Sequence, residues 1–221
     1  MSLAAHELRT PLSVVSGYLR MLLREQGGPL SEKQRKMLEE ADRSCARMAA
    51  LVSEMSELGK LESGQLELEK RPIDLVALLA ELASHMHEGS DRGVRLEIRG
   101  TERPLPVIGD RSRLGTAIGA LIHASLRERG EPGVIVAQCS ATAGPQPAAI
   151  IAISDESSVR TLAQAAAAGA PFDEWARGGL GLALPVARRI VEAHGGALWS
   201  AHGDAARTGS ALRIPLNDGS V

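Results

Sequence analysis

Aromatic residues and cysteines are scarce in this sequence. One Tyr, one Phe and two Trp make up 2% of the 221 residues, so we expect hydrophobic cores built from Leu, Ile, Val, Ala and Met. So few aromatic side chains argue against a stacking platform for single-stranded nucleic acid. The two cysteines, Cys45 and Cys139, lie far apart without metal-ligand spacing, and we interpret them as reduced thiols.

Long apolar runs and an excess of one charge are missing as well. No run of about 18 apolar residues, the length that spans a membrane, occurs in the sequence, and no signal peptide is visible. The formal net charge of −2 gives no reason to expect nucleic acid or another polyanion as a partner. We therefore expect a cytoplasmic location, no membrane contact by these residues and no metal site. His85, His87, His194 and His202 have no ligand partners at metal spacing and are interpreted as surface or capping residues.

What the sequence does contain, at its start, is the pattern of two long amphipathic helices. The first is predicted from residue 3 to about residue 26, and the second from Ser31 to about Lys60. Gly27 suits the C-terminal cap of the first helix, and Ser31 suits the N-cap of the second. Two helices cannot bury both apolar stripes alone, so we predict a dimer that forms a four-helix bundle. Packing on the rest of the chain is the alternative. The stripes consist of Leu8, Leu12, Val15, Leu19 and Leu22, and of Leu38, Ala41, Cys45, Met48, Val52 and Met55.

Beyond residue 62 the pattern changes to alternating helices and strands. Helices are predicted near residues 74–85, 110–129, 162–168 and 181–194, and strands near 93–100, 134–139, 149–154, 197–201 and 211–216. This order predicts an α/β sandwich with helices on one face of a mixed sheet. We divide the chain into a helical hairpin, residues 1–62, and an α/β domain, residues 63–221.

The motif HELRTP, residues 6–11, carries the chemistry of the first helix. His6 and Thr10 are four residues apart and share a helix face, and Glu7 lies beside His6. Pro11 cannot donate to the carbonyl of Glu7 and crowds it, which predicts a bend next to the histidine. An exposed histidine near a carboxylate is a good nucleophile for a phosphoryl group, because the carboxylate can accept the ring proton. Thr10 is placed to orient a water molecule or a partner's side chain.

The segment HELRTPLSVVSGYLRMLL, residues 6–23, resembles the phosphoacceptor box of bacterial sensor histidine kinases of two-component systems. LGKLESGQLELEKRPIDL, residues 58–75, is similar to the family's passage into its ATP-binding domain, and residues 179–201 are similar to its second glycine box. The resemblance implies a homodimer whose partner is a response-regulator receiver domain. It implies that His6 is the phosphoacceptor, Glu7 its base, and Thr10 the residue that supports dephosphorylation of the regulator's phospho-aspartate.

The family's magnesium ligands are absent from the matching helix of this sequence. In the family, two asparagines four residues apart hold Mg²⁺, which prefers such oxygen ligands, and contact phosphate. Their positions are occupied here by Ala120 and Ala124, which offer no ligand atom. His123 and Ser125 flank the second position but point about 100° away from it on a helix. Glu128, one turn further on, is an alternative ligand.

The rest of the family's nucleotide site is reduced too. Asp155 matches the aspartate that binds adenine, but Ser157 and Val159 occupy the following glycine positions. FDEWAR, residues 172–177, resembles the aromatic box and continues directly into glycines without a lid over the phosphates. Gly179 and Gly181 could still cradle phosphate at a helix N-terminus. We interpret Asp155, Gly179 and Gly181 as a vestigial nucleotide site.

Three hypotheses follow for the function. In the first, the chain is a conventional histidine kinase that binds ATP and Mg²⁺ and phosphorylates His6. In the second, which we favour, it is a dimeric phosphotransfer or phosphatase module that needs no cofactor, and His6 receives phosphate from a partner kinase or a phosphorylated regulator. In the third, it is a structural dimer in which His6 is a relic. We also expect a sensor domain ahead of residue 1 and leave open whether the full-length protein is attached to a membrane.

Overall fold

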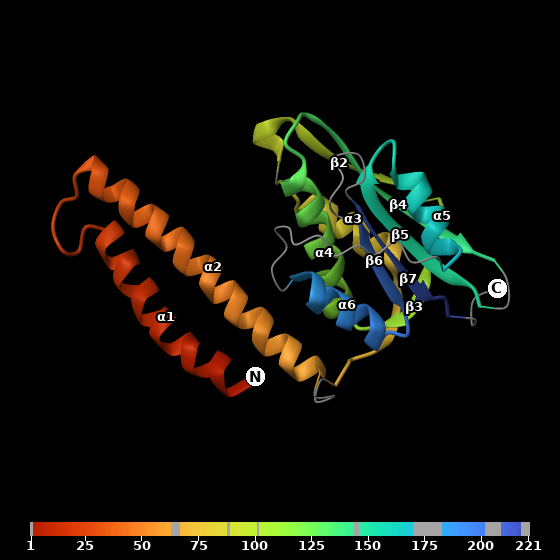
Figure 1. The fold of residues 1–221 in the computed structure, drawn as a ribbon, viewed down its shortest axis with the longest axis horizontal. Helices are drawn as coiled ribbons and strands as arrows, with labels where there is room; N and C mark the ends of the chain where they lie inside the picture. Colours follow the sequence, from red (N-terminus) through yellow and green to blue (C-terminus); the bar gives the residue numbers. More distant parts are fainter. Residues whose placement is uncertain are drawn as a thin grey trace. The chain divides into compact units, whose positions relative to one another are not determined.

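The computed structural model describes residues 2–62, 67–87, 89–100, 102–143, 146–169, 183–201 and 209–217. The chain divides into two compact units, residues 1–66 and residues 67–221 (Figure 1). The predicted domain boundary after residue 62 falls beside residues 63–66, which lie outside the described ranges, and it stays a prediction. No helix in the described ranges is long and apolar enough to cross a membrane.

The first unit is a hairpin of two helices, α1 (Ser2–Leu23) and α2 (Glu32–Glu62), which lie side by side (Figure 1). The longer helix has 31 residues, or about 46 Å at 1.5 Å per residue. Ala5 of α1 is buried together with Cys45 and Val52 of α2. The thiol of Cys45 donates to the carbonyl of Leu12 at 3.6 Å, so this cysteine belongs to the helix–helix contact.

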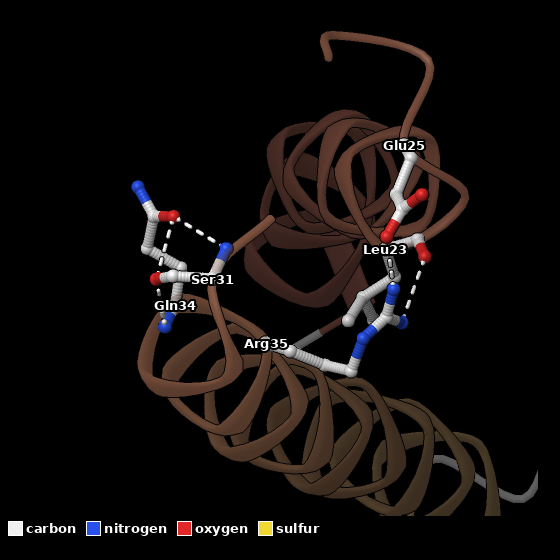
Figure 2. A network of polar contacts seen from close by, with 5 residues as sticks. All are labelled: Leu23, Glu25, Ser31, Gln34 and Arg35. Atoms are coloured by element: carbon white, nitrogen blue, oxygen red, sulfur yellow. Dashed lines mark hydrogen bonds and ion pairs between the residues drawn. The ribbon is translucent and has the colours of Figure 1, made fainter. Parts of the chain in front are cut away.

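A reciprocal capping box begins α2 (Figure 2). The hydroxyl oxygen of Ser31 accepts from the backbone N–H of Gln34 at 3.3 Å, and the Gln34 side-chain oxygen accepts from the N–H of Ser31 at 2.9 Å. Two of the N–H groups that a helix start leaves unpaired are thereby satisfied. The prediction that Ser31 caps the second helix is confirmed.

The predicted glycine cap of α1 is wrong. The left-handed residue at this end is Glu25, with φ of 58°. Its N–H donates to the carbonyl of Leu22 at 2.8 Å, and the next N–H, of Gln26, donates to Met21 at 3.1 Å. This Schellman arrangement usually contains glycine. Arg35 of α2 reaches back to donate to the carbonyl of Leu23 and to pair with Glu25 (Figure 2), which holds a glutamate where the backbone favours glycine.

The second unit is built on a five-stranded mixed sheet with the order β2-β4-β5-β7-β6. β2 pairs with β4 in parallel, and the other three pairs are antiparallel. β1 and β3 form a separate antiparallel ribbon. β3 was not predicted, because its four residues, PVIG (106–109), are too few to show the alternation of a strand. The bounds are β1 Arg71–Asp74, β2 Val94–Arg99, β3 Pro106–Gly109, β4 Gly133–Thr142, β5 Ala148–Asp155, β6 Ala197–Ala201 and β7 Gly209–Pro215.

Helices cover both faces of this sheet (Figure 1). α3 (Leu75–Ser84), α4 (Arg111–Glu128) and α6 (Ala183–Ala193) lie on one side, and α5 (Val159–Ala167) lies on the other; a short 3-10 turn, η1, spans Ser90–Arg92. The prediction of helices on one face only is therefore wrong. Residues 148–154 of β5 are all buried, so both of its faces need a cover. Ile150 and Ala152 pack with Val159 and Leu162 of α5.

Candidate functional site

The predicted phosphoacceptor motif lies near the start of α1, which runs through Pro11 as one helix. Thr10 follows His6 by one helical turn, and Glu7 is adjacent to His6 in sequence. The side chains of Glu7 and Thr10 are exposed, whereas that of His6 lies outside the described part of the chain. A carboxylate and a hydroxyl are thus presented to solvent within one turn of the histidine. The predicted bend at Pro11 stays a prediction.

The hairpin also exposes an apolar flank. Nine of the ten exposed large apolar side chains among the described residues belong to α1 and α2. Leu8, Val15 and Leu22 follow one another at intervals of seven, with exposed fractions of 47%, 49% and 40%. Such spacing places them on one seam of the helix. An apolar surface of this kind marks an interaction site. The nine are Leu8, Val14, Val15, Tyr18, Met21, Leu22, Met37, Met48 and Leu51.

In the second unit, α4 carries the positions at which the family has its asparagines. Ala120 is half-buried and Ala124 is buried, with 2% exposed, and a methyl group cannot ligate a cation. The Ser125 hydroxyl beside them is buried and donates to the carbonyl of Leu121 at 3.0 Å. No group of three His, Cys, Asp or Glu side chains in the described ranges could hold a metal ion. Ala120 and Ala124 therefore offer no oxygen atom to the magnesium of a nucleotide complex.

Asp155, at the end of β5, holds together its own turn. Its Oδ1 accepts from the backbone N–H groups of Ser157 at 2.9 Å and Ser158 at 3.0 Å, and from the Ser157 hydroxyl. Burial alone would raise the pKa of Asp155, but hydrogen bonds from the two serines outweigh it and hold the pKa below its usual value. Val159 then begins α5 and is buried. The geometry is that of an Asx turn leading into a helix.

A surface hollow of about 680 Å³ lies where the C-terminal end of α4 approaches β4 and the end of β5. It brings Glu128 of α4 together with Asp155 and Glu156, and Arg129 and Glu131 also line it. Four carboxylates and one guanidinium line this hollow, and the carboxylate of Glu156 is paired with Arg99 of β2. The other predicted nucleotide-site residues, Gly179 and Gly181, lie outside the described residues, as do residues 172–177.

The interpretation of His194 as a surface or capping residue is wrong for surface exposure and right for capping. The side chain is buried, with 6% exposed, and its Nδ1 bonds to the carbonyl of Ile190 in the last turn of α6 at 2.6 Å, as a C-terminal capping side chain does. Metal-ligand spacing gave no sign of the burial. His85, by contrast, is exposed and is the C-cap residue of α3. His202 lies outside the described ranges.

Comparison with known proteins gives a family match for the hairpin. Residues 1–64 match the model of the His Kinase A (phospho-acceptor) domain. The chain is 33% identical over 136 residues to the signal transduction histidine-protein kinase BarA of Escherichia coli K12, a match over 60% of this chain and 14% of BarA. It is 29% identical over 224 residues to the probable sensor histidine kinase TcrY of Mycobacterium tuberculosis, over 97% of this chain and 45% of TcrY. The chain thus spans less than half of either relative.

Solved structures of histidine kinases share the fold. Full-length ShkA, crystallised in complex with AMPPNP, has a TM-score of 0.70 at 21% identity, over 97% of this chain and 44% of ShkA. The histidine kinase AdeS of Acinetobacter baumannii has a TM-score of 0.62, also at 21% identity, over 96% of this chain and 98% of the AdeS chain. At this level of identity the likeness establishes the fold of a helical hairpin followed by an α/β sandwich, and no more.

Proposed function

Because the chain is related to the sensor histidine kinases of two-component signalling, we propose that it exchanges phosphoryl groups between His6 and an aspartate of a response-regulator receiver domain. The observation that carries this proposal is the contrast between a complete HELRTP motif and alanines at positions 120 and 124. Every residue of the phosphotransfer motif is present in the hairpin, whereas the positions matched to the family's magnesium ligands hold alanine.

The phosphotransfer step uses groups on α1 and on the regulator. A ring nitrogen of His6 attacks the phosphorus of the regulator's aspartyl phosphate, and the P–O bond to the aspartate breaks as the P–N bond forms. Glu7 accepts the proton that the ring loses, and the aspartate leaves as a carboxylate. The reverse reaction returns the phosphoryl group. An aspartate of another protein must approach through solvent, and the exposure of Glu7 is consistent with that approach.

The phosphatase step uses a water molecule instead of the histidine. Thr10, which is exposed one turn from His6, orients the water for attack on the phosphorus of the aspartyl phosphate. The P–O bond to the aspartate breaks, and inorganic phosphate is released. Neither step requires ATP on this chain.

The working form in this proposal is a homodimer in the cytoplasm. The exposed apolar flank of α1 and α2 supports a dimer, since these side chains gain burial in a four-helix bundle. Each fully buried Leu or Val contributes about 1.5–3 kcal/mol relative to an exposed one. The match of residues 1–64 to a phospho-acceptor domain supports both the dimer and the response-regulator partner.

The proposal is tested by phosphotransfer from receiver domains that have been phosphorylated with acetyl phosphate. We expect acid-labile phosphate on the wild-type chain and none on His6→Ala, which should remain folded and dimeric. His87→Ala removes an exposed histidine of the second unit and should keep the label. Phosphate on His6→Ala would contradict the assignment of His6. A wild-type chain that neither accepts phosphate from, nor dephosphorylates, any receiver domain of the source organism would contradict the proposed function.

A conventional ATP-dependent kinase is the second candidate. It is favoured by the 680 Å³ hollow beside α4, because Glu128 could replace one lost ligand there. The likeness in fold to ShkA, whose crystal structure contains AMPPNP, points the same way. ATP binding separates the two candidates.

A further inference from the structure

Residues 67–70, where the chain enters the second unit ahead of β1, are held there by two side-chain hydrogen bonds. The backbone N–H of Glu69 donates to Oδ2 of Asp110 at 3.1 Å. The ammonium group of Lys70 donates to the carbonyl of Ala193, at the C-terminus of α6, at 2.8 Å. One bond leads to the start of α4 and the other to the end of α6, so this entry segment (residues 67–70) is tied to both helices.

Asp110 joins the entry segment to α4 because both of its carboxylate oxygens are used. Oδ1 accepts from the backbone N–H of Arg113 at 3.1 Å and caps the helix, while Oδ2 accepts from Glu69. Burial alone would raise the pKa of Asp110, but the N–H donors of Arg113, Glu69 and Ser112 hold it below its usual value. The carboxylate therefore stays charged, and its position decides whether Glu69 is held.

His194 in turn fixes the position of Asp110. Its Nε2 accepts from the backbone N–H of Asp110 at 2.9 Å, and its Nδ1 donates to the carbonyl of Ile190 at 2.6 Å. Only a neutral ring with its proton on Nδ1 can make both bonds. The ring is buried, with 6% exposed, and it lies close to Gly109, where an added Cβ would come within 3.1 Å of its Cδ2 atom.

We propose that the contact between His194 and Asp110 is a proton-sensitive device that holds the entry segment against the start of α4 and releases this contact when the ring becomes charged. A proton on Nε2 removes the acceptor and sets an N–H of the ring against the N–H of Asp110. The backbone of Asp110 must then move away, and its carboxylate moves with it. Glu69 loses its acceptor, and the hold of the entry segment on α4 is lost.

Burial of the ring favours its neutral form at neutral pH. Burial lowers the pKa of His194; the bond to Ile190 raises it, the charge of Lys70 lowers it and that of Asp110 raises it, with a net shift below the ordinary value. On its own helix, Glu192 pairs with Arg189. A group with a lowered pKa binds more protons in the released state, where the value returns to about 6.5. The contact is therefore complete above pH of about 6.5 and is lost as the pH falls through the lower pKa of the closed state.

Hydrogen exchange of the complete chain tests this device. We expect the protection of the backbone amides of residues 67–70, corrected for intrinsic exchange, to fall several-fold between pH 7.5 and pH 5.5, with about ten-fold as the upper limit for a single histidine. In His194→Gln, the side-chain oxygen can accept from Asp110 and the amide can donate to Ile190 without titrating, so protection should be constant. His87→Gln, the control at an exposed histidine, should keep the wild-type fall.

Three results would overturn the proposal. They are constant protection in the wild type, an equal fall in His194→Gln, and an equal fall in the amides of β5, which would show that the whole unit unfolds. If His194→Gln does not fold, NMR of the wild type decides. The ring of His194 and the amide of Glu69 must titrate with one midpoint, and separate midpoints would contradict the device.

Discussion

The two units differ in where their apolar side chains lie. The hairpin exposes nine large apolar side chains, whereas among the described residues of the second unit only Ile108, at 39%, is exposed to this degree. Seven consecutive residues of β5 are buried, and helices cover both sheet faces. The described residues of the hairpin therefore leave apolar surface exposed, and those of the second unit leave little.

The difference extends to chemistry. The hairpin presents Glu7 and Thr10 to solvent beside His6, on the unit that has most surface to bury. In the second unit the polar groups at the predicted nucleotide site are used internally: Asp155 holds its own turn, and the Ser125 hydroxyl bonds to the helix backbone.

The largest expected effect concerns the apolar flank. Val15→Glu should raise the dissociation constant of the homodimer about 100-fold, because the variant dimer buries two carboxylates, one from each protomer, at a cost of about 1.4 kcal/mol each. Sedimentation velocity over a range of concentrations measures this constant. Ile108→Glu, the matched change in the second unit, should leave it unchanged. Equal effects of the two changes would contradict the claim that the hairpin, and not the second unit, forms the dimer interface. No effect of Val15→Glu would show that the apolar flank is not the interface.

A smaller effect is expected at Thr10. Thr10→Ala should slow dephosphorylation of the phosphorylated receiver domain about ten-fold, as expected for one lost hydrogen bond of about 1.4 kcal/mol to the attacking water. Transfer between the receiver and His6 should continue. Ser13→Ala is the control, since that hydroxyl already donates to the carbonyl of Arg9 at 2.9 Å. Dephosphorylation is followed as release of inorganic phosphate, and an unchanged rate in Thr10→Ala would remove the role given to this residue.

The smallest effect concerns the turn between the helices. Glu25→Gly and Glu25→Ala both lose the ion pair with Arg35, but only glycine relieves the left-handed backbone at φ of 58°. The glycine variant should be more stable than the alanine variant by about 1 kcal/mol. Urea unfolding of the hairpin, followed by circular dichroism, measures the difference. Equal stabilities would mean that residue 25 is not strained.

Most of the fold could be predicted because it follows local patterns. Apolar residues spaced by three and four predicted α1, α2 and α4, and short apolar runs predicted β4 and β5. The predicted ends of β4 and β5 lie within a few residues of the observed ones. Contacts between distant segments were harder. The ribbon of β1 and β3 pairs two four-residue strands, which are too short to show the alternation of a strand. The position of α5 on the second face of the sheet depends on packing between distant residues, which the local sequence pattern does not indicate.

The candidate site could be predicted only where a motif carried it. HELRTP predicts roles for His6, Glu7 and Thr10 because the three residues lie within two helical turns, and these roles stay predictions. The hydrogen bond from the N–H of Asp110 to the ring of His194 joins residues 84 positions apart in the chain. No sequence motif marks a histidine that accepts from a backbone N–H. Glu25 was missed for a similar reason: Arg35, ten positions away, offsets a conformation that the residue alone disfavours.

The central claim is that the second unit does not bind ATP. It is tested most directly by calorimetric titration of the purified chain with ATP and Mg²⁺ up to millimolar concentration. The alanines at positions 120 and 124 predict no saturable heat. Saturable heat that depends on magnesium would contradict the claim and establish the conventional kinase as the better account.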